Sequence, residues 1–366
     1  MKKILCLIDT LGIGGAERQM MGLAYLLKQK GYQVDLVTYI AHDFQDVLMN
    51  RYGMTSQTLP VNNSQWSKLM AVRKYIKQNG GYDWVITYKG GPNGIGCLLK
   101  LMGMRFKLIV SERITNSEVG NRRTRFNMYK FANYVVPNAQ SQADFLSAHF
   151  PWMKKKIVTI TNFTDTDTFK PAEVLPHPEI RILTTARVAR QKNVLNYLDA
   201  VALFKKKANG LNVHFDWYGE VQSTELDYGE AVKQKVKDLG IEDIFTFHDG
   251  TKEIVDKYQQ CDIYCLPSNF EGYPNVVCEA MSCGKPVVAS RVCDIPYILK
   301  ENENGLMFDP SDINDIADKL LKMVSMPKEQ REDWGRKGRE IAETLFSRES
   351  FVNKYISLIE NKAEKK

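Results

Sequence analysis

Long apolar runs are missing from this 366-residue sequence, and none reaches the roughly 18 residues that a transmembrane helix needs. The basic start at residues 1–3 leads into an apolar stretch that ends at Asp9, without the small-residue cleavage site of a signal peptide. We therefore expect a first β-strand at this point and a cytoplasmic protein.

Proline is scarce, and cysteine follows no metal-binding pattern. The 13 prolines and a charged fraction of 25% exclude a collagen-like or largely disordered chain. The seven cysteines form no Cys-x-x-Cys pair, and five of them fall between Cys261 and Cys293, where apolar segments run. This distribution favours reduced thiols in a core over a zinc site.

Signals for a metal site or a nucleophilic triad are weak. Asp165 and Asp167 have the Asp-x-Asp spacing that binds a metal and a nucleotide in some sugar transferases, but they lie in an Asn- and Thr-rich stretch where a turn is expected. The following histidines show neither ligand spacing nor a Ser-His-Asp or Cys-His arrangement: His149, His177, His214 and His248. We expect no metal and no cofactor.

The net charge of +7 is unevenly distributed along the chain. Residues 1–170 carry 23 Lys and Arg against 11 Asp and Glu, whereas the remainder carries 27 against 32. A basic half indicates nucleic acid, an anionic membrane surface or an anionic substrate as partner, or simply a solvated basic face. No aromatic-rich RNA motif or recognition-helix pattern supports nucleic acid, so we expect none.

Short β-branched runs alternate with amphipathic helical stretches, which predicts parallel βαβ units. The expected strands are residues 3–8, 33–38, 84–87, 108–111, 134–136 and 158–161, then 181–185, 213–218, 245–247, 263–266 and 286–289. Between the two sets, three prolines in the eight residues from Pro171 to Pro178 indicate a linker.

The sequence therefore predicts an α/β protein of two doubly wound, Rossmann-like domains that face each other across a cleft, the default place for a site. The domains are residues 1–168 and 181–345, joined by a linker at 169–180. Residues 346–366 carry Phe351, Tyr355, Leu358 and Ile359 at helical intervals, which predicts an amphipathic C-terminal helix that could cross back to the first domain.

A glycine-containing loop precedes a short helix in the second half. Pro274 suits the first turn of that helix and Gly284 its C-terminal cap, so residues 275–283 are predicted to be helical. The amides of the first turn and the helix dipole would form an anion site. Glu279 lies about 6 Å along this helix. Its carboxylate would need sugar hydroxyls, cations or water as partners, or it lies exposed on the solvent side.

Two cations follow the first strand of the second half. Arg187 and Lys192 would face an anion at the strand ends, where Arg forks onto two oxygens and Lys supplies a point charge, as a diphosphate requires. The alternative is a pair of ordinary surface cations.

Glycines separate the first strand from the helical stretch at residues 16–30. Gly14 and Gly15 would let backbone amides approach a phosphate, or they form a plain tight turn. A dinucleotide-binding Gly-x-Gly-x-x-Gly would need a glycine where Glu17 stands, which argues against a nicotinamide or flavin enzyme.

Basic and apolar residues are interleaved at residues 66–77, 97–107 and 121–131. Helices of this kind could lie on anionic lipid, with Trp, Phe and Met in the apolar layer and Lys and Arg at the head groups. They could equally be ordinary core-facing helices.

These motifs occur in an order that resembles family 4 of the retaining glycosyltransferases, of the GT-B fold, over essentially the whole chain. The most specific element is the Glu-x7-Glu pattern from Glu271 to Glu279. The resemblance implies that Glu279 binds the donor ribose and that Glu271 contacts the transferred sugar. It also implies further donor-binding residues: Gly14, Gly15, Arg187, Lys192, Gly272, Tyr273, Asn275, Val276 and Val277.

One departure concerns the end of the fourth strand of the first domain, where many members carry a His. This chain reads Val110-Ser111-Glu112-Arg113, which is similar to the bacterial surface-polysaccharide branch, including hexose and N-acetylhexosamine transferases that act on lipid-linked intermediates. We expect Glu112 to join Glu271, Arg187 and Lys192 as a catalytic residue and Arg113 to bind the acceptor. A structural Glu–Arg pair is the alternative.

The resemblance thus implies retaining, metal-independent transfer of a hexose or N-acetylhexosamine from a nucleotide sugar, with UDP as the expected nucleotide. The expected acceptor is a lipid-linked oligosaccharide or lipopolysaccharide, reached by peripheral association of the basic domain with the anionic inner face of the cell membrane. A nucleotide-sugar 2-epimerase of the same fold and a non-catalytic nucleotide-sugar binding protein remain alternatives.

Overall fold

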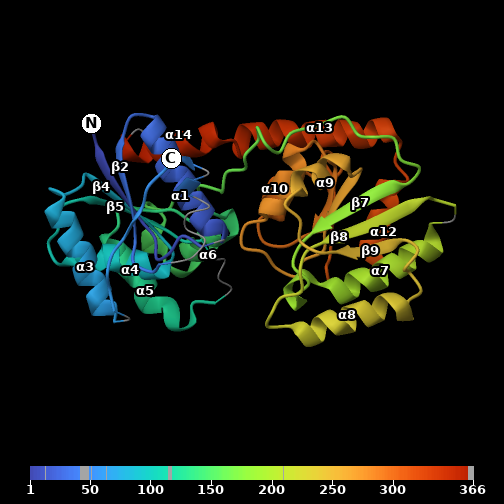
Figure 1. Ribbon diagram of the computed structural model, residues 1–366, viewed down its shortest axis with the longest axis horizontal. Coiled ribbons are helices and arrows are strands. Elements are labelled where there is room, and N and C mark those ends of the chain that lie inside the picture. Colours follow the sequence, from blue (N-terminus) through green and yellow to red (C-terminus); the bar gives the residue numbers. More distant parts are fainter. Residues whose placement is uncertain are drawn as a thin grey trace. The chain divides into compact units, whose positions relative to one another are not determined.

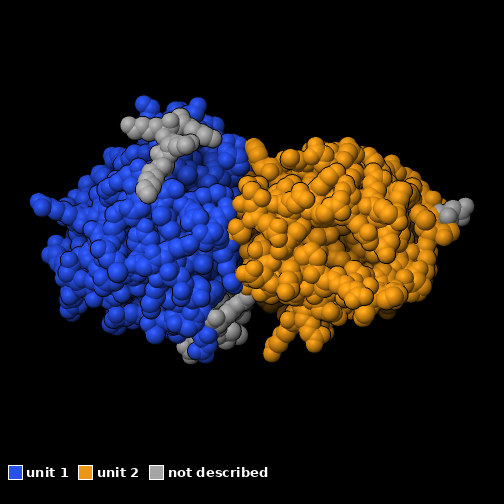
Figure 2. Space-filling model, turned by 90° about the horizontal axis from the view of Figure 1, so that it is seen from above, with its two compact units in different colours: residues 1–163, 348–366 blue, residues 164–347 orange. Residues whose placement is uncertain are grey.

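Each half of the chain folds around its own six-stranded parallel sheet. The computed structural model describes residues 1–12, 14–41, 49–50, 52–62, 64–113, 118–208 and 210–361. Unit 1 comprises residues 1–163 and 348–366, and unit 2 comprises residues 164–347 (Figure 2). The predicted α/β fold of two doubly wound sheets is confirmed.

The sheet of unit 1 has the strand order β3-β2-β1-β4-β5-β6. Figure 1 labels β2, β4 and β5 of this sheet. Its strands are β1 Lys3–Leu7, β2 Gln33–Thr38, β3 Gln57–Thr58, β4 Trp84–Tyr88, β5 Lys107–Ser111 and β6 Tyr134–Val135. The helices are α1 Gly15–Gln29, α3 Gln65–Gln78, α4 Gly90–Leu101, α5 Arg123–Met128, α6 Gln140–His149 and α14 Arg348–Ile359, with 3-10 turns η1 Gly120–Arg122, η2 Tyr129–Phe131 and η3 Pro151–Met153.

The sheet of unit 2 has the order β12-β11-β10-β7-β8-β9. Its strands are β7 Ile180–Thr185, β8 Val213–Tyr218, β9 Phe245–His248, β10 Ile263–Leu266, β11 Val287–Ser290 and β12 Gly305–Phe308. The helices are α7 Val194–Lys207, α8 Leu226–Asp238, α9 Ile254–Gln260, α10 Asn275–Ser282, α11 Ile295–Ile298, α12 Ile313–Val324 and α13 Lys328–Leu345, with η4 at Arg190–Lys192. Counted from its own first strand, each sheet has the order 3-2-1-4-5-6, which reverses between its first and fourth strands.

The alternation of β1 shows how unit 1 is layered. Ile4 and Cys6 are fully buried in one apolar cluster, which also contains side chains of α1 and α14. Leu5 and Leu7 are fully buried in a second cluster, with side chains of α3, α4, α5 and α6. A parallel sheet covered on both faces requires such continuous apolar strands, which is why they were recognisable in the sequence.

The structure differs from the expected strands in three places. No strand forms at residues 158–161, although Ile157 makes an isolated bridge to Val135 and the Val158 and Ile160 N–H groups donate to the carbonyls of Val135 and Pro137 at 3.0 and 3.1 Å. The edge strands β3 and β12 were not predicted. β3 is two residues long, and β12 follows a turn rich in Asn and Glu, so neither presents the long β-branched run that marks a strand.

The C-terminal helix α14 is part of unit 1. Phe351 and Tyr355 are buried in the cluster that also contains α1, and the Phe351 ring packs on Phe163 with 5.1 Å between centroids. The Tyr355 hydroxyl lies 2.9 Å from the hydroxyl of Tyr88 at the end of β4. The last helix of the chain therefore supports the carboxyl end of the sheet of unit 1.

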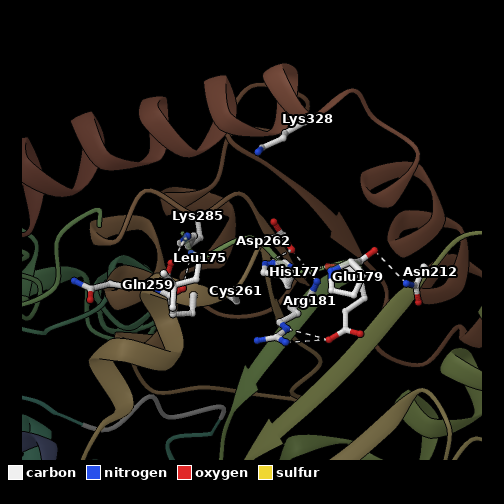
Figure 3. Close-up of polar contacts among 12 residues, drawn as sticks. Leu175, His177, Glu179, Arg181, Asn212, Gln259, Cys261, Asp262, Lys285 and Lys328 are labelled. Atoms are coloured by element: carbon white, nitrogen blue, oxygen red, sulfur yellow. Dashed lines mark hydrogen bonds and ion pairs between the residues drawn. The ribbon is translucent and has the colours of Figure 1, made fainter. Parts of the chain in front are cut away.

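The proline-rich segment expected to be a linker at 169–180 belongs to unit 2, because the units divide at Phe163 and Thr164. It has no helix or strand before β7 begins at Ile180, yet it is bonded to its neighbours (Figure 3). The Leu175 N–H donates to Gln260 Oε1 at 2.9 Å, and His177 Nε2 lies 3.5 Å from Asp262 Oδ2. The prolines at 171–178 therefore indicate irregular backbone that is bonded within unit 2, and not a flexible linker.

Among the described residues, no helix combines the length and apolar character needed to cross a membrane.

Candidate functional site

Two loops of unit 2 meet where its strand order reverses, between β7 and β10. Lys192, at the end of η4 after β7, places its Nζ 2.7 Å from Oε1 of Glu271 in the loop after β10. Only 12% of the Lys192 side chain and 9% of the Glu271 side chain are exposed. The structure thereby joins two predicted residues that lie 79 positions apart in the sequence.

Backbone and amide contacts hold these loops together. Gln191 Nε2 donates to the Phe270 carbonyl at 2.9 Å, and the Asn269 N–H donates to the Gln191 carbonyl at 2.9 Å. Asn193 follows η4 in the left-handed conformation (φ +58°), which asparagine tolerates well, and starts α7. The two loops that carry the ion pair are therefore held together by hydrogen bonds of their own.

Glu279 is half-buried on α10, and its carboxylate is held by a tyrosine of α9. Tyr258 donates its hydroxyl hydrogen to Glu279 Oε2 at 3.0 Å, and its oxygen lies 2.6 Å from Thr185 Oγ1 at the end of β7. Burial, together with the nearby Tyr264 and Glu279, raises the pKa of Tyr258 well above its usual value, so the phenol stays protonated. Sequence reasoning missed Tyr258 because no motif links α9 to α10.

The helix that carries Glu279 forms almost as expected. It spans Asn275–Ser282, and Gly284 follows it with φ +72°, the conformation of a glycine cap. A Cβ on Gly335 of α13 would collide with the Gly284 carbonyl, so only glycine allows this close approach. Arg339 Nη1 of α13 also donates to the Ser282 carbonyl at 2.7 Å. Helix α13 therefore fixes the C-terminal end of α10.

The first turn of α10 differs in part from the expected anion site. The amides of Asn275 and Val277 are bonded within the turn, to the carbonyls of Tyr273 and Pro274 at 2.8 and 3.0 Å. Tyr273 is 6% exposed, and its ring lies edge-on to Phe346. A Cβ on Gly272 would meet no atom within 4 Å, so this loop borders open space. That Gly272, Tyr273 and residues 275–277 bind the donor stays a prediction.

Arg187 is exposed after β7 and makes no hydrogen bond or ion pair with the described part of the chain. Its guanidinium is therefore available to an anion without breaking an internal contact.

Asp165 accepts a hydrogen bond from Thr168 Oγ1 at 2.8 Å, which confirms the turn expected there.

A cysteine that the sequence analysis did not single out contacts the site. Sγ of Cys293 accepts a hydrogen bond from the Glu271 N–H at 3.3 Å. Cys293 has φ +49°, a conformation that is costly for a residue with a Cβ. Burial raises the pKa of its thiol, so the sulfur stays neutral beside the Glu271 carboxylate.

In unit 1, the predicted glycines lie at the start of α1. Gly14 precedes the helix and Gly15 is its first residue. A Cβ on Gly14 would collide with the carboxylate of Glu17, which is 7% exposed and pairs with Lys89 Nζ at 2.5 Å. Lys89 Nζ also lies 2.9 Å from Asp9 Oδ1. The glycine at position 14 thus accommodates a buried carboxylate, a reason for glycine that the sequence did not reveal.

Glu112 is 2% exposed after β5 and lies in a polar network of unit 1. It accepts from the Tyr129 hydroxyl and from Asn93 Nδ2 at 3.3 Å, and it pairs with Arg125 Nη2 at 3.2 Å. The alternative of a structural Glu–Arg pair is thus present, but its arginine is Arg125 rather than the adjacent Arg113.

The predicted residues do not line a cavity that unit 2 carries beside β7–β9. This cavity, of about 720 Å³, is bordered by His177, Arg181, Asp216, His248 and neighbours on β7–β9 and α9. Lys192, Glu271 and Glu279 lie outside its lining. The candidate site is therefore defined by its convergent charges and not by cavity size.

We predict that Lys192→Met destabilises unit 2 by about 3–5 kcal/mol, because it leaves the Glu271 carboxylate buried without a counter-charge. The double variant Lys192→Met/Glu271→Gln removes both charges and should recover most of the loss. Free energies of unfolding in urea measure both effects. A Lys192→Met protein as stable as the wild type would contradict a buried, mutually compensating pair.

Comparisons with known proteins agree with this geometry. Residues 13–168 match the family model Glycosyltransferase Family 4, and residues 165–341 match Glycosyl transferases group 1. An uncharacterized glycosyltransferase of Haemophilus influenzae is 26% identical over 339 residues, covering 90% of this chain and 92% of that protein.

A second relative, from Campylobacter jejuni, is named GalNAc-alpha-(1->4)-GalNAc-alpha-(1->3)-diNAcBac-PP-undecaprenol alpha-1,4-N-acetyl-D-galactosaminyltransferase. It is 27% identical over 332 residues, covering 87% of this chain and 88% of that protein. Among solved structures, Anabaena Alr3699/HepE in complex with UDP superposes with a TM-score of 0.84 at 19% identity, covering 99% of this chain and 100% of that one.

The two family models together extend from residue 13 to residue 341, and each falls on one of the two doubly wound halves. The chain belongs to the glycosyltransferases of the GT-B fold, with a family 4 module followed by a group 1 module.

Proposed function

We propose that this protein is a retaining glycosyltransferase that moves a hexose or N-acetylhexosamine from a UDP-sugar to a hydroxyl of a lipid-linked saccharide. The observation that carries the proposal is the presence of two hydrogen-bonded side-chain pairs beside the strand-order reversal of unit 2. Lys192 and Glu271 join the loops after β7 and β10, and Tyr258 joins Glu279 to Thr185 at the end of β7. The undecaprenol-linked substrate in the name of the Campylobacter relative and the UDP bound to the Anabaena structure support the choice of acceptor and nucleotide.

In this proposal Glu279 accepts hydrogen bonds from the ribose hydroxyls. The hydrogen bond from Tyr258 to Oε2 fixes the rotamer of the carboxylate, and Tyr258 is in turn fixed through Thr185. Because the carboxylate is already oriented before the ligand arrives, it binds two hydroxyls of a diol without the entropic cost of fixing its rotamer on binding. Tyr258 is thus a positioning residue for the ribose.

Lys192 and Arg187 supply the charge for the diphosphate. Lys192 exchanges Glu271 for phosphate oxygens when the donor binds, and Glu271 then accepts from hydroxyls of the transferred sugar. Arg187, which has no partner among the described residues, adds a second cation. The Lys192–Glu271 pair keeps both groups compensated until the donor arrives.

Departure of UDP places negative charge on its β-phosphate, which these cations stabilise at about 1.5–3 kcal/mol for each charge-assisted hydrogen bond. We propose that the acceptor oxygen attacks on the face from which the phosphate leaves. The anomeric C–O bond to phosphate breaks, the bond to the acceptor forms, and the acceptor proton passes to the departing phosphate. This route needs neither a protein nucleophile nor a metal, and it retains the configuration.

The experiment is a panel of nucleotide sugars in EDTA, read by thermal stabilisation, by slow hydrolysis and by NMR of the anomeric configuration of the released sugar. We expect one UDP-sugar to stabilise the protein and to yield product of retained configuration. Glu279→Gln should lose this response by tenfold or more while folding normally, and the exposed Glu242→Gln should not. Inversion at the anomeric carbon would overturn the retaining proposal.

Other products of the same panel point to other functions. Conversion of the donor to its epimer without an acceptor identifies a nucleotide-sugar 2-epimerase. Stabilisation by a donor without any turnover identifies a binding protein. No response to any nucleotide sugar contradicts the proposed donor site.

We further propose that unit 1 associates with an anionic membrane surface. Helix α3 carries basic residues and no acidic one, and its Trp66 is 66% exposed. By contrast, Phe126 and Tyr129 of the segment 121–131 are fully buried, so those aromatic rings belong to the core. The support for membrane binding therefore comes from α3.

Sedimentation with phosphatidylglycerol vesicles tests this association at low salt. Trp66→Ala should lower the bound fraction severalfold, because it removes an exposed aromatic anchor. Leu226→Ala, which removes a side chain of similar exposure (64%) from unit 2, is the control. Equal binding of all three proteins would contradict a role for α3.

A further inference from the structure

Arg113 differs from the other buried charges at the carboxyl end of the sheet of unit 1. Glu17 pairs with Lys89, and Glu112 pairs with Arg125. Arg113 is 8% exposed, and no carboxylate among the described residues pairs with it. Within the described part of unit 1 it is therefore a buried cation without a counter-charge.

The Arg113 guanidinium is nevertheless firmly placed. Its Cζ lies 3.6 Å from the centroid of the Tyr88 ring, and Nη1 donates to Asn162 Oδ1 at 2.9 Å. The Tyr88 hydroxyl is bonded to that of Tyr355, so helix α14 holds the ring on which Arg113 stacks. This arrangement fixes the plane and the orientation of the guanidinium.

One side of the Arg113 guanidinium, formed by Nε and Nη2, makes no hydrogen bond in the described structure. Both nitrogens are buried. Together these two nitrogens form the edge of a guanidinium that binds both oxygens of one carboxylate or phosphate. Arg73 and Arg125 are only half-buried, and each has one buried nitrogen, Nε, without a hydrogen-bond partner among the residues that the structure describes.

A second polar atom follows the neighbouring strand. Asn138, after β6, is 3% exposed, and its Oδ1 has no hydrogen-bond partner among the described residues. Its backbone N–H donates to the Glu112 carbonyl at 3.1 Å, which places Asn138 beside the segment that carries Arg113. Buried donors and acceptors without partners are costly, and a ligand is their usual partner at the carboxyl ends of the strands of an α/β sheet.

We propose that Arg113 binds an anionic group of the acceptor through its Nε and Nη2 edge, with the two oxygens of a phosphate or a carboxylate as its partners. The proposal rests on the glycosyltransferase function proposed above and restricts its acceptors to those that carry such an anion. Asn138 Oδ1 accepts from a hydroxyl of the same ligand. Tyr355 is a positioning residue, which acts through Tyr88.

The test is calorimetric binding of small anions to the full chain with UDP at saturation, so that the donor diphosphate site is filled. The probes are inorganic phosphate, inorganic diphosphate and malonate. We expect at least one to bind the wild type and to bind Arg113→Lys at least tenfold more weakly, because lysine keeps the charge but lacks the two-nitrogen edge. Preference for phosphate or for malonate identifies which anion the acceptor carries.

Lys28→Gln is the matched control, because it removes one exposed positive charge from the same unit. Its affinity for the probes should stay within twofold of the wild type. Absence of binding by the wild type, or equal binding by Arg113→Lys and the wild type, overturns the proposal.

A second variant keeps the arginine in place. Asn162→Asp puts a carboxylate beside Nη1, so it should raise the free energy of unfolding and weaken probe binding at least tenfold. Unchanged probe affinity in Asn162→Asp contradicts the proposal even where Arg113→Lys fails to fold.

UDP binding separates this inference from the proposed function. If the wild type and all variants bind UDP but none binds a probe, only the proposed anion site is contradicted. If the wild type itself does not bind UDP, the proposed function is contradicted.

Discussion

The ion pair between Lys192 and Glu271 is the contact on which the rest of the candidate site depends. It joins the loop after β7 to the loop after β10, at the point where the strand order of unit 2 reverses. The two loops lead to opposite sides of the sheet at such a reversal. Neither charge tolerates this burial alone, so each keeps the other in place. The same two groups are those that a nucleoside diphosphate sugar needs, a cation for the phosphate and a carboxylate for the sugar. Donor binding therefore replaces one compensated arrangement by another.

Unit 1 repeats the arrangement with its own residues. Its sheet has the same strand order, and Lys89 after β4 pairs with Asp9 after β1 across the corresponding reversal. Burial lowers the pKa of Lys89, but the hydrogen bonds to Glu17 and Asp9 outweigh it and raise the pKa overall, so the ammonium stays charged. Lys89 has φ +73°, a conformation that costs energy for a residue with a Cβ. The difference lies at Arg113, whose Nε and Nη2 have no hydrogen-bond partner among the described residues.

The sequence predicted those features that depend on neighbouring residues. Strand periodicity located most of both sheets, and Pro274 with Gly284 located α10 to within one residue. Contacts between distant segments were not predictable. Nothing in the sequence places Tyr258 against Glu279, and the adjacency of Glu112 to Arg113 pointed to a pair that the fold makes with another arginine. The prolines at 171–178 correctly indicated irregular backbone, but only the fold shows that this segment is part of unit 2 and hydrogen-bonded within it.

The exchange of Glu271 for phosphate at Lys192 is tested most directly by the affinity of Glu271→Gln for UDP alone, measured by calorimetry. In the wild type, Lys192 must give up its carboxylate before it contacts the diphosphate, whereas in the variant it has no such partner. The account predicts that Glu271→Gln binds UDP as tightly as the wild type or more tightly, although it no longer turns over the nucleotide sugar. A tenfold or greater loss of UDP affinity in Glu271→Gln would contradict it.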